Sequence, residues 1–131
     1  MGTVHKRLID LRPRFIPLID DVDVKLGDGI EFAVSGGTAW VLIPGTAVVL
    51  ATRSEPARRA HVESGAEWWR TFTAFAVTAD APVRVEVVGA ARNRLKRELS
   101  YSILCCPGGD GYPYYAQGAS PPRIRLPPPK E

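Results

Sequence analysis

The most constraining feature of this chain is a regular alternation of apolar and polar residues, interrupted at short intervals by glycine-rich turns. Val83, Val85 and Val87, for example, are separated by Arg84 and Glu86. A period of two sends successive side chains to opposite faces of a β-strand, whereas an amphipathic helix repeats its apolar side about every 3.6 residues. Because no segment of helical length has the longer period, the sequence predicts an all-β protein.

The alternation and the turns between its segments predict an ordered set of strands. The predicted strands are residues 22–26, 30–35, 39–43, 46–52, 68–78, 83–87 and 98–105. We expect residues 27–29 (Gly-Asp-Gly) to close a hairpin between the first two, because glycine adopts the positive φ angles of tight turns. Residues 53–67 are polar and do not alternate, so they are predicted to form a long loop. Short strands joined in this way form two packed sheets, and we expect an antiparallel β-sandwich of jelly-roll type.

Proline and glycine distinguish the C-terminal end of the chain from its centre. Residues 107–131 contain seven of the twelve prolines and four of the twelve glycines. A segment of this composition cannot bury enough apolar surface to form a core of its own. The chain of 131 residues is long enough for a single domain, which we place at residues 18–106. Residues 1–17 and 107–131 are predicted to be extended arms that dock on another subunit.

The two predicted arms carry the residues that we expect to bind a partner. In the C-terminal arm, Ile124 and Leu126 share one parity and alternate with two arginines, so an extended chain presents apolar side chains on one face and guanidinium groups on the other. Tyrosine is enriched at protein interfaces because it combines a large rigid ring with a polar tip. The predicted partner-binding residues are Arg12, Arg14, Phe15, Tyr112, Tyr114, Tyr115, Arg123, Ile124, Arg125 and Leu126.

Residues that carry catalysis or bind metals are few and badly spaced. The only histidines are His5 and His61, whereas a jelly-roll enzyme of the cupin type places two or three histidines and a carboxylate on adjacent strands. Cys105 and Cys106 are neighbours, which permits only a strained disulfide and gives no CxxC spacing for zinc, so we expect free thiols. We expect no catalytic residue, no metal site and no cofactor, and we predict that the protein is not an enzyme.

The charged residues also argue against other ligands. The formal net charge is +3, and nucleic-acid binding is not expected because no concentrated basic face is evident. Asp20, Asp21 and Asp23 lack the spacing of a calcium-binding loop, so a solvated strand face is the favoured interpretation. Neither a run of about 20 apolar residues nor a secretion signal is present, so we expect no membrane contact and synthesis in the cytoplasm.

A short β-sandwich with arms rich in proline and arginine, together with the strand-turn-strand text of residues 75–85 (FAVTADAPVRV), resembles the decoration or cement proteins of bacteriophage capsids. The resemblance implies a non-enzymatic structural protein of the virion, made in the host cytoplasm and acting in many copies as a homo-oligomer. It implies the major capsid protein or another virion protein as the partner.

Two alternatives share these sequence features. Tail or baseplate adaptor proteins of phages have the same combination of a small β domain and extended segments. A carbohydrate-binding or receptor-binding β module would instead use Trp40, Trp68 or Trp69, together with the tyrosines near residue 114, as a stacking platform.

Overall fold

Every regular element that the structure describes is a β-strand, which confirms the predicted all-β class. The computed structural model describes residues 2–12, 19–45, 47–51, 58–61, 71–91, 93–95, 97–108, 114–115 and 122–129, with the backbone alone for residues 58–61, 71–72 and 114–115. The strands are β1 (Val4–Asp10), β2 (Val22–Asp23), β3 (Gly29–Ser35), β4 (Gly37–Pro44), β5 (Val48–Leu50), β6 (Arg58–His61), β7 (Thr71–Val77), β8 (Val83–Val87), β9 (Glu98–Ser100), β10 (Ser102–Pro107), β11 (Tyr114–Tyr115) and β12 (Arg123–Arg125).

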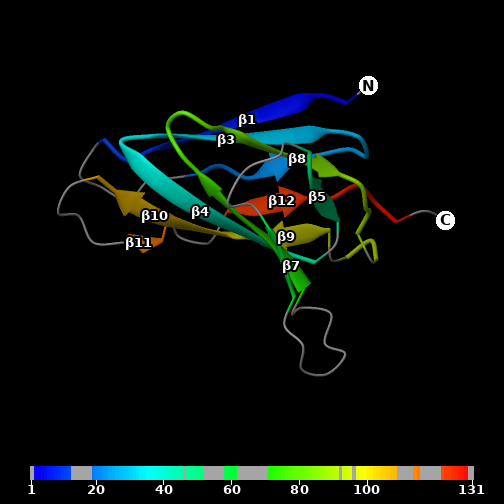
Figure 1. Ribbon diagram of the computed structural model, residues 1–131. Helices are drawn as coiled ribbons and strands as arrows, with labels where there is room; N and C mark the ends of the chain where they lie inside the picture. The colour runs from blue at the N-terminus through cyan, green and yellow to red at the C-terminus, as the bar shows by residue number, and fades with distance from the viewer. Residues whose placement is uncertain are drawn as a thin grey trace.

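The strands form three sheets arranged as a sandwich. The four-stranded sheet has the order β1-β3-β8-β5, the five-stranded sheet β11-β10-β4-β7-β6, and the three-stranded sheet β2-β12-β9. In Figure 1, the sheet that contains β1 and β3 lies over the strands of the other two sheets. Two pairings are parallel, β1 with β3 and β2 with β12, so the expectation of a wholly antiparallel sandwich is wrong at these two places.

Two long segments run through both layers as bent strands. β3 continues into β4 through Gly36, whose φ of 86° lies in the left-handed region that favours glycine. β7 continues into β8 through a turn closed by a bridge between Thr78 and Ala81. β3 pairs with β8 in one layer and β4 pairs with β7 in the other, both antiparallel. One ladder therefore folds over the corner of the sandwich and ties its two layers together.

The core between the layers is built by the predicted alternation. All three valines of β8 are buried and the two charged residues between them are exposed, which confirms the predicted faces of this strand. The ring of Phe32 in β3 lies 5.6 Å from that of Phe75 in β7 and 5.9 Å from that of Tyr101, measured between centroids. Tyr101 stands where the chain passes from β9 to β10, so these rings join all three sheets.

The described parts of both predicted arms are strands of the domain, so the predicted domain limits of 18–106 are wrong. β1 pairs with β3 along its whole length, and Ile9 and Leu11 are buried in the core. β12 lies between β2 and β9, and Ile124 and Leu126 belong to the same core. Pro122 and Pro127 flank β12 and favour an extended backbone, and the short stretch between them pairs with two strands whose facing edges would otherwise be open.

Two local predictions also need correction. Gly27 has the positive φ of 88° expected of a turn, but the strands on either side of it do not pair with each other. β2 pairs with β12 and β3 pairs with β1 and β8, because partners far along the chain supply the better packing. The predicted loop of residues 53–67 contains β6, a polar edge strand that pairs with β7 and needs no apolar alternation.

Candidate functional site

The three-stranded sheet brings together three segments that are far apart in the sequence. β12 runs parallel to β2 and antiparallel to β9, which sets Ile124 level with Val22 on one side and Leu99 on the other. Ile124 and Val22 are buried against the core. Because side chains alternate along a strand, the neighbours Arg123 and Arg125 point to the outer side of the sheet, toward acidic residues of the flanking segments.

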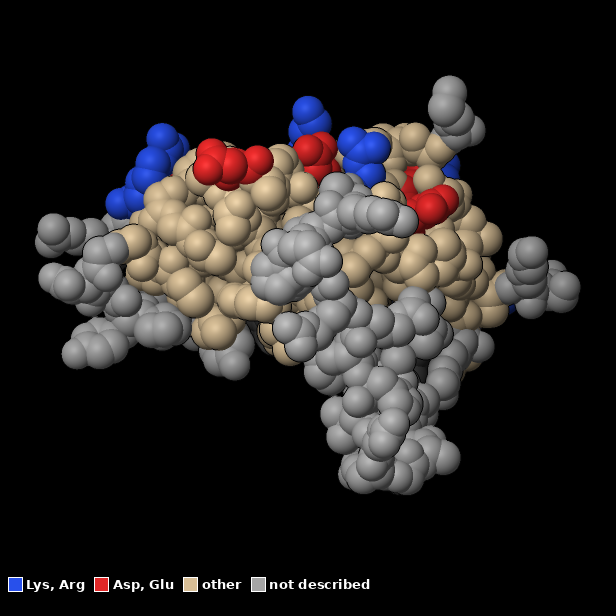
Figure 2. Space-filling view, in the orientation of Figure 1, with Lys and Arg blue, Asp and Glu red and all other residues tan. Residues whose placement is uncertain are grey.

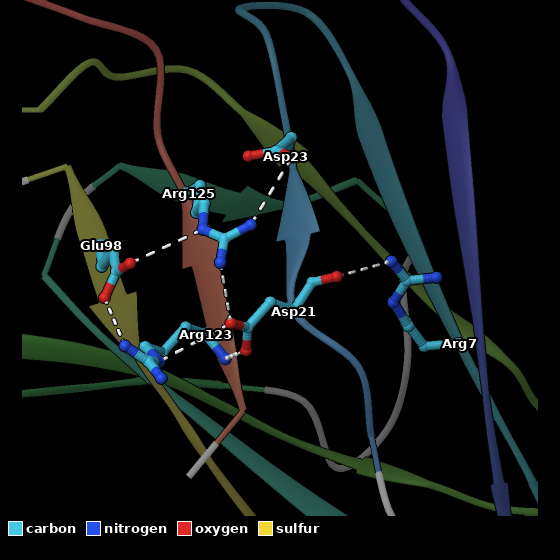
Figure 3. A network of polar contacts seen from close by, with 6 residues as sticks. All are labelled: Arg7, Asp21, Asp23, Glu98, Arg123 and Arg125. Carbon is cyan, nitrogen blue, oxygen red and sulfur yellow. Dashed lines mark hydrogen bonds and ion pairs between the residues drawn. The ribbon is translucent and has the colours of Figure 1, made fainter. Parts of the chain in front are cut away.

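These outer side chains form one continuous network of ion pairs (Figure 3). Arg123 Nη1 lies 2.6 Å from Glu98 Oε2, and Arg125 Nη2 lies 3.3 Å from Asp21 Oδ2. Arg125 also lies 3.6 Å from Glu98 and 3.7 Å from Asp23. Arg125 therefore contacts acidic side chains on both flanking segments, which holds the three strands side by side.

Asp21 is the anchor of the network. Its Oδ1 accepts a hydrogen bond from the backbone N–H of Arg123 at 3.0 Å, and its carbonyl accepts one from Arg7 Nη2 at 3.4 Å. On the other strand, the hydrogen bond from Arg123 is the main reason that the pKa of the Glu98 carboxyl lies below its ordinary value. The carboxylates are already neutralised by guanidinium groups, so the network is suited to fixing strands and less suited to attracting a further cation.

A hollow of about 440 Å³ lies beside the network, lined by Asp23, Leu95, Arg97, Glu98 and Arg125. Leu95 has 95% of its surface exposed. Its N–H donates to Asn93 Oδ1 at 2.9 Å, which holds the chain in a tight turn. Two residues after Leu95, the chain is bonded to the sandwich, because the N–H of Leu126 donates to the carbonyl of Arg97 at 2.7 Å. The turn thus holds an apolar side chain in water, where a partner can cover it.

The edge strand β1 is a second candidate surface. It ends the order of the four-stranded sheet, and no strand among the described residues pairs with its free side. Val4 and Leu8 lie on its outer face with 38% and 56% of their surface exposed, and Lys6 stands between them. Figure 2 shows basic and acidic side chains next to one another along the side of the molecule on which β1 lies in Figure 1. Such an edge offers a row of backbone N–H and C=O groups to another strand.

His5 and Asp28 form the pair that most resembles part of a catalytic site. His5 Nε2 lies 2.9 Å from Asp28 Oδ2. The same carboxylate accepts hydrogen bonds from the backbone N–H groups of Thr3 and Lys25, both at 3.0 Å. Asp28 is buried and joins two backbone segments to one imidazole. This pair therefore fastens the start of β1 to the turn before β3.

The four predicted contacts of the C-terminal segment meet their own chain. Ile124 and Leu126 are wrong as partner contacts, because their side chains are buried in the domain core. Arg123 and Arg125 do reach carboxylates, as predicted, but these carboxylates belong to β9 and to the segment around β2. The parity of these residues was predicted correctly and the identity of their partner was not.

The remaining predicted contacts are spread over the molecule. Arg12 lies on the surface with Nε 2.8 Å from Asp10 Oδ1. Tyr114 and Tyr115 form β11, which pairs with β10, and only their backbone is described. The residues outside the described part of the chain are Arg14, Phe15 and Tyr112. Leu95 was not among the predicted contact residues. The sequence does contain a signal for it, a single leucine inside the basic stretch of residues 92–97.

The two cysteines are free thiols, as predicted, with Cys105 buried and Cys106 half-buried. Among the described residues, no three His, Cys, Asp or Glu side chains are grouped so that they can hold a metal ion. Within the same part of the chain, no helix has the length and apolar character needed to cross a membrane. The sequence matches no known family model and no curated protein.

Proposed function

We propose that this chain is a non-enzymatic structural protein that binds other protein subunits in an assembly, of the kind that decoration or cement proteins form on bacteriophage capsids. The observation that supports this function is the exposed Leu95 on its fixed turn. Arg94 and Arg97 flank the leucine and both are exposed. The complementary partner is a protein surface with an apolar pocket and carboxylates at its rim, on the major capsid protein or another virion protein.

The hydrogen bonds around Leu95 favour binding because they form within the chain before a partner arrives. The Asn93 side chain holds the turn, and the backbone of Arg97 is bonded to that of Leu126 next to the ion-pair network. A contact residue that is fixed before binding loses little conformational freedom when the partner covers it. The network of Asp21, Glu98 and the two arginines of β12 therefore serves the function indirectly, by holding the base of the turn.

The order of the strands supports the same proposal. From β3 to β8 the chain passes back and forth between the layers, with β3 beside β8 and β4 beside β7, as in a long hairpin that has been rolled up. We assign this connectivity to the jelly-roll type, a fold used by viral capsid proteins. The virion is the proposed location.

A carbohydrate-binding or receptor-binding module is the alternative. Such sites stack an apolar face of their ligand on aromatic rings. The hollow beside Leu95 is lined by charged side chains and this single leucine. Of the aromatic residues that the alternative uses, Trp40 lies half-buried in β4 and does not line this hollow, and Trp68, Trp69 and Tyr112 lie outside the described part of the chain. Protein contact therefore suits the described surface better.

The test uses virus particles assembled from the genome that encodes the chain, analysed by quantitative mass spectrometry. Many copies per capsid are expected. Leu95→Asp should reduce the copy number about tenfold, because a charge replaces the buried anchor of the contact. The control Leu26→Asp, at a turn residue with 46% exposure, should leave the copy number unchanged. Absence from particles contradicts the proposal, and presence in isolated tails alone favours an adaptor.

A further inference from the structure

The backbone of β1 alternates between bonding to β3 and facing its free side. The carbonyl of Thr3 accepts from the N–H of Gly29 at 2.9 Å, and the N–H of Leu11 donates to the carbonyl of Ser35 at 2.8 Å. In a strand, the N–H and C=O of one residue point to the same side, and the next residue points to the opposite side. The odd-numbered residues of β1 therefore bond to β3. The even-numbered residues present their N–H and C=O groups along the free edge.

We propose that this edge pairs with β1 of a second copy of the chain, antiparallel and about a twofold axis at Leu8. In this register Leu8 meets Leu8 of the second copy, and Lys6 meets Asp10 of the second copy on each side of the axis. The two four-stranded sheets then join into one continuous sheet. The inference rests on the proposed function, because it names the first partner that an assembly-forming subunit needs, a copy of itself.

The parity of the edge limits the registers that are available. Residues with free N–H and C=O groups must face one another, so an even-numbered residue must stand opposite an even-numbered residue. A twofold axis at Lys6 sets two ammonium groups against each other, and an axis at Asp10 sets two carboxylates against each other. Like charges directly opposite are destabilising. An axis at Arg7 sets Lys6 opposite Leu8 and Asp10 opposite Val4, so neither charge meets an opposite charge of the second copy.

The axis at Leu8 is the register in which the side chains complement one another. Lys6 and Asp10 form two ion pairs related by the axis, and the exposed Leu8 side chains cover each other. Each Asp10 carboxylate also keeps its own Arg12, which lies 2.8 Å from Oδ1 and 2.9 Å from Oδ2, and its remaining lone pairs are those that face Lys6 of the second copy. About six backbone hydrogen bonds form between residues 6, 8 and 10 of the two copies. Arg7 Nη1 already donates to the carbonyl of Lys6 at 3.0 Å, and that oxygen has a second lone pair for the new bond. The pairing ends near Arg12, whose N–H is taken by Asp10 Oδ1 at 3.1 Å.

Lysine on a free edge is often a device against aggregation. Here Lys6 selects the register in which two copies of β1 pair. It repels a second copy that is centred on Lys6 and attracts one that is centred on Leu8. The same residue therefore favours one register of self-pairing and opposes a neighbouring one. The dimer is closed because the twofold axis uses the same edge of both copies, which leaves neither β1 edge free for a third copy.

The first test is cross-linking of the full chain in a Cys106→Ser background, which removes the half-buried thiol. Leu8→Cys should give a covalent dimer with a short bismaleimide reagent, because residue 8 of both copies lies on the axis. The control Val88→Cys is similarly exposed at 47% but lies after the central strand β8, and it should stay monomeric. Equal cross-linking at the two positions, or none at residue 8, overturns the proposal.

The second test exchanges the charges and uses light scattering over a range of protein concentrations. Lys6→Glu should weaken dimer formation about tenfold or more, since it sets two pairs of carboxylates against each other. In an Arg12→Ala background, which removes the partner that Asp10 has in its own chain, the double variant Lys6→Glu/Asp10→Lys should restore most of the affinity that Lys6→Glu loses, and equal melting temperatures show that the monomers remain folded. Failure of the double variant to recover overturns the register. Dimerisation that persists when the chain is absent from virus particles refutes the proposed function alone, and a monomeric chain found in particles refutes this inference alone.

Discussion

The carboxylate of Asp28 lies 2.9 Å from Nε2 of His5 and fastens the start of the edge strand β1 to the turn before β3. An ionised carboxylate can only accept hydrogen bonds, so the imidazole donates at Nε2. Two backbone N–H groups, of Thr3 and Lys25, complete the set of donors. A single buried side chain thus holds Thr3 and His5, at the start of β1, against the turn before β3.

Removal of this charge should destabilise the fold and change its response to acid. The hydrogen bond from His5 is the largest of the contacts that hold the pKa of Asp28 below its ordinary value of 3.8. Because the folded-state pKa is lowered, the stabilisation is fully present above about pH 4 and is lost as the pH falls through the folded-state pKa. Asp28→Asn should lower the free energy of unfolding by about 2 kcal/mol near neutral pH.

Urea unfolding near neutral pH and at about pH 3 measures both effects. Asp28→Asn should lose less stability than the parent chain between the two conditions. Asp20→Asn, at an exposed carboxyl, is the matched control and should follow the parent. An identical acid response in parent and Asp28→Asn would show that the carboxylate is not the titrating anchor.

The buried face of β8 should not accept a charge. Val85 is fully buried and stands between Ile30 of β3 and Leu50 of β5. Val85→Asp should cost roughly 3 kcal/mol or more, since an unpaired carboxylate would enter the core. The neighbouring exposed substitution Glu86→Gln should stay within about 0.5 kcal/mol of the parent. Thermal unfolding compares the two, and an unchanged melting temperature for Val85→Asp is incompatible with this strand assignment.

The C-terminal strand should contribute to the stability of the isolated domain. Ile124 is fully buried between β2 and β9, so Ile124→Ala should lower the free energy of unfolding by about 2–4 kcal/mol. Pro128→Ala, at an exposed position of the same segment, is the control. Denaturant unfolding of the monomer measures the difference. A parent-like result for Ile124→Ala would mean that the segment is a docking arm after all.

Replacing Tyr101 with phenylalanine should stabilise the folded domain. Its hydroxyl oxygen is buried and has no hydrogen-bond partner among the described residues. A buried hydroxyl without a partner has lost its hydration and gained nothing in return, so Tyr101→Phe should raise the free energy of unfolding near neutral pH by about 1 kcal/mol. Urea unfolding measures this change. A loss of stability in Tyr101→Phe would reveal a partner for the hydroxyl.

The same burial makes the domain sensitive to alkali. Burial raises the pKa of Tyr101 from 10.0 to about 12. The neutral ring is favoured in the folded state, so its contribution is complete below the unfolded pKa and is lost as the pH rises through the folded one. Tyr101→Phe should therefore lose less stability than the parent across that window. Equal alkaline slopes for the two proteins would rule out Tyr101 as the responsible group.

The sequence predicted correctly which faces of the strands are buried, but it did not predict which strands pair with one another. The alternation in β8 predicted correctly which side chains are buried, and the parity of Ile124 and Leu126 predicted that they share an apolar face. Parity, however, says nothing about which strand lies alongside. Gly27 makes the predicted turn, yet the segments on either side of it join different sheets, because long-range packing overrides a local hairpin signal.

The candidate surfaces were only partly predictable for the same reason. The two arginines of β12 were identified as charged contacts, but Asp21 and Glu98 become their partners through a sheet that only the fold assembles. Leu95 and Leu99 are four residues apart, a spacing that fits one face of a helix and one face of a strand equally well. Leu95 stands in a turn closed by a hydrogen bond to the Asn93 side chain, and the periodicity of the sequence does not reveal such a bond.

The insertion of β12 between β2 and β9 has a consequence for folding during synthesis on the ribosome. Asp21 and its backbone partner Arg123 are separated by 102 residues, so β2 emerges long before its neighbour is synthesised. Until β12 is synthesised, β2 and β9 lack the strand that pairs with both of them, which delays completion of the fold. A premature stop codon before residue 122 would remove β12 and leave β2 and β9 with unpaired edges. Such edges favour aggregation and expose the chain to chaperones and proteases.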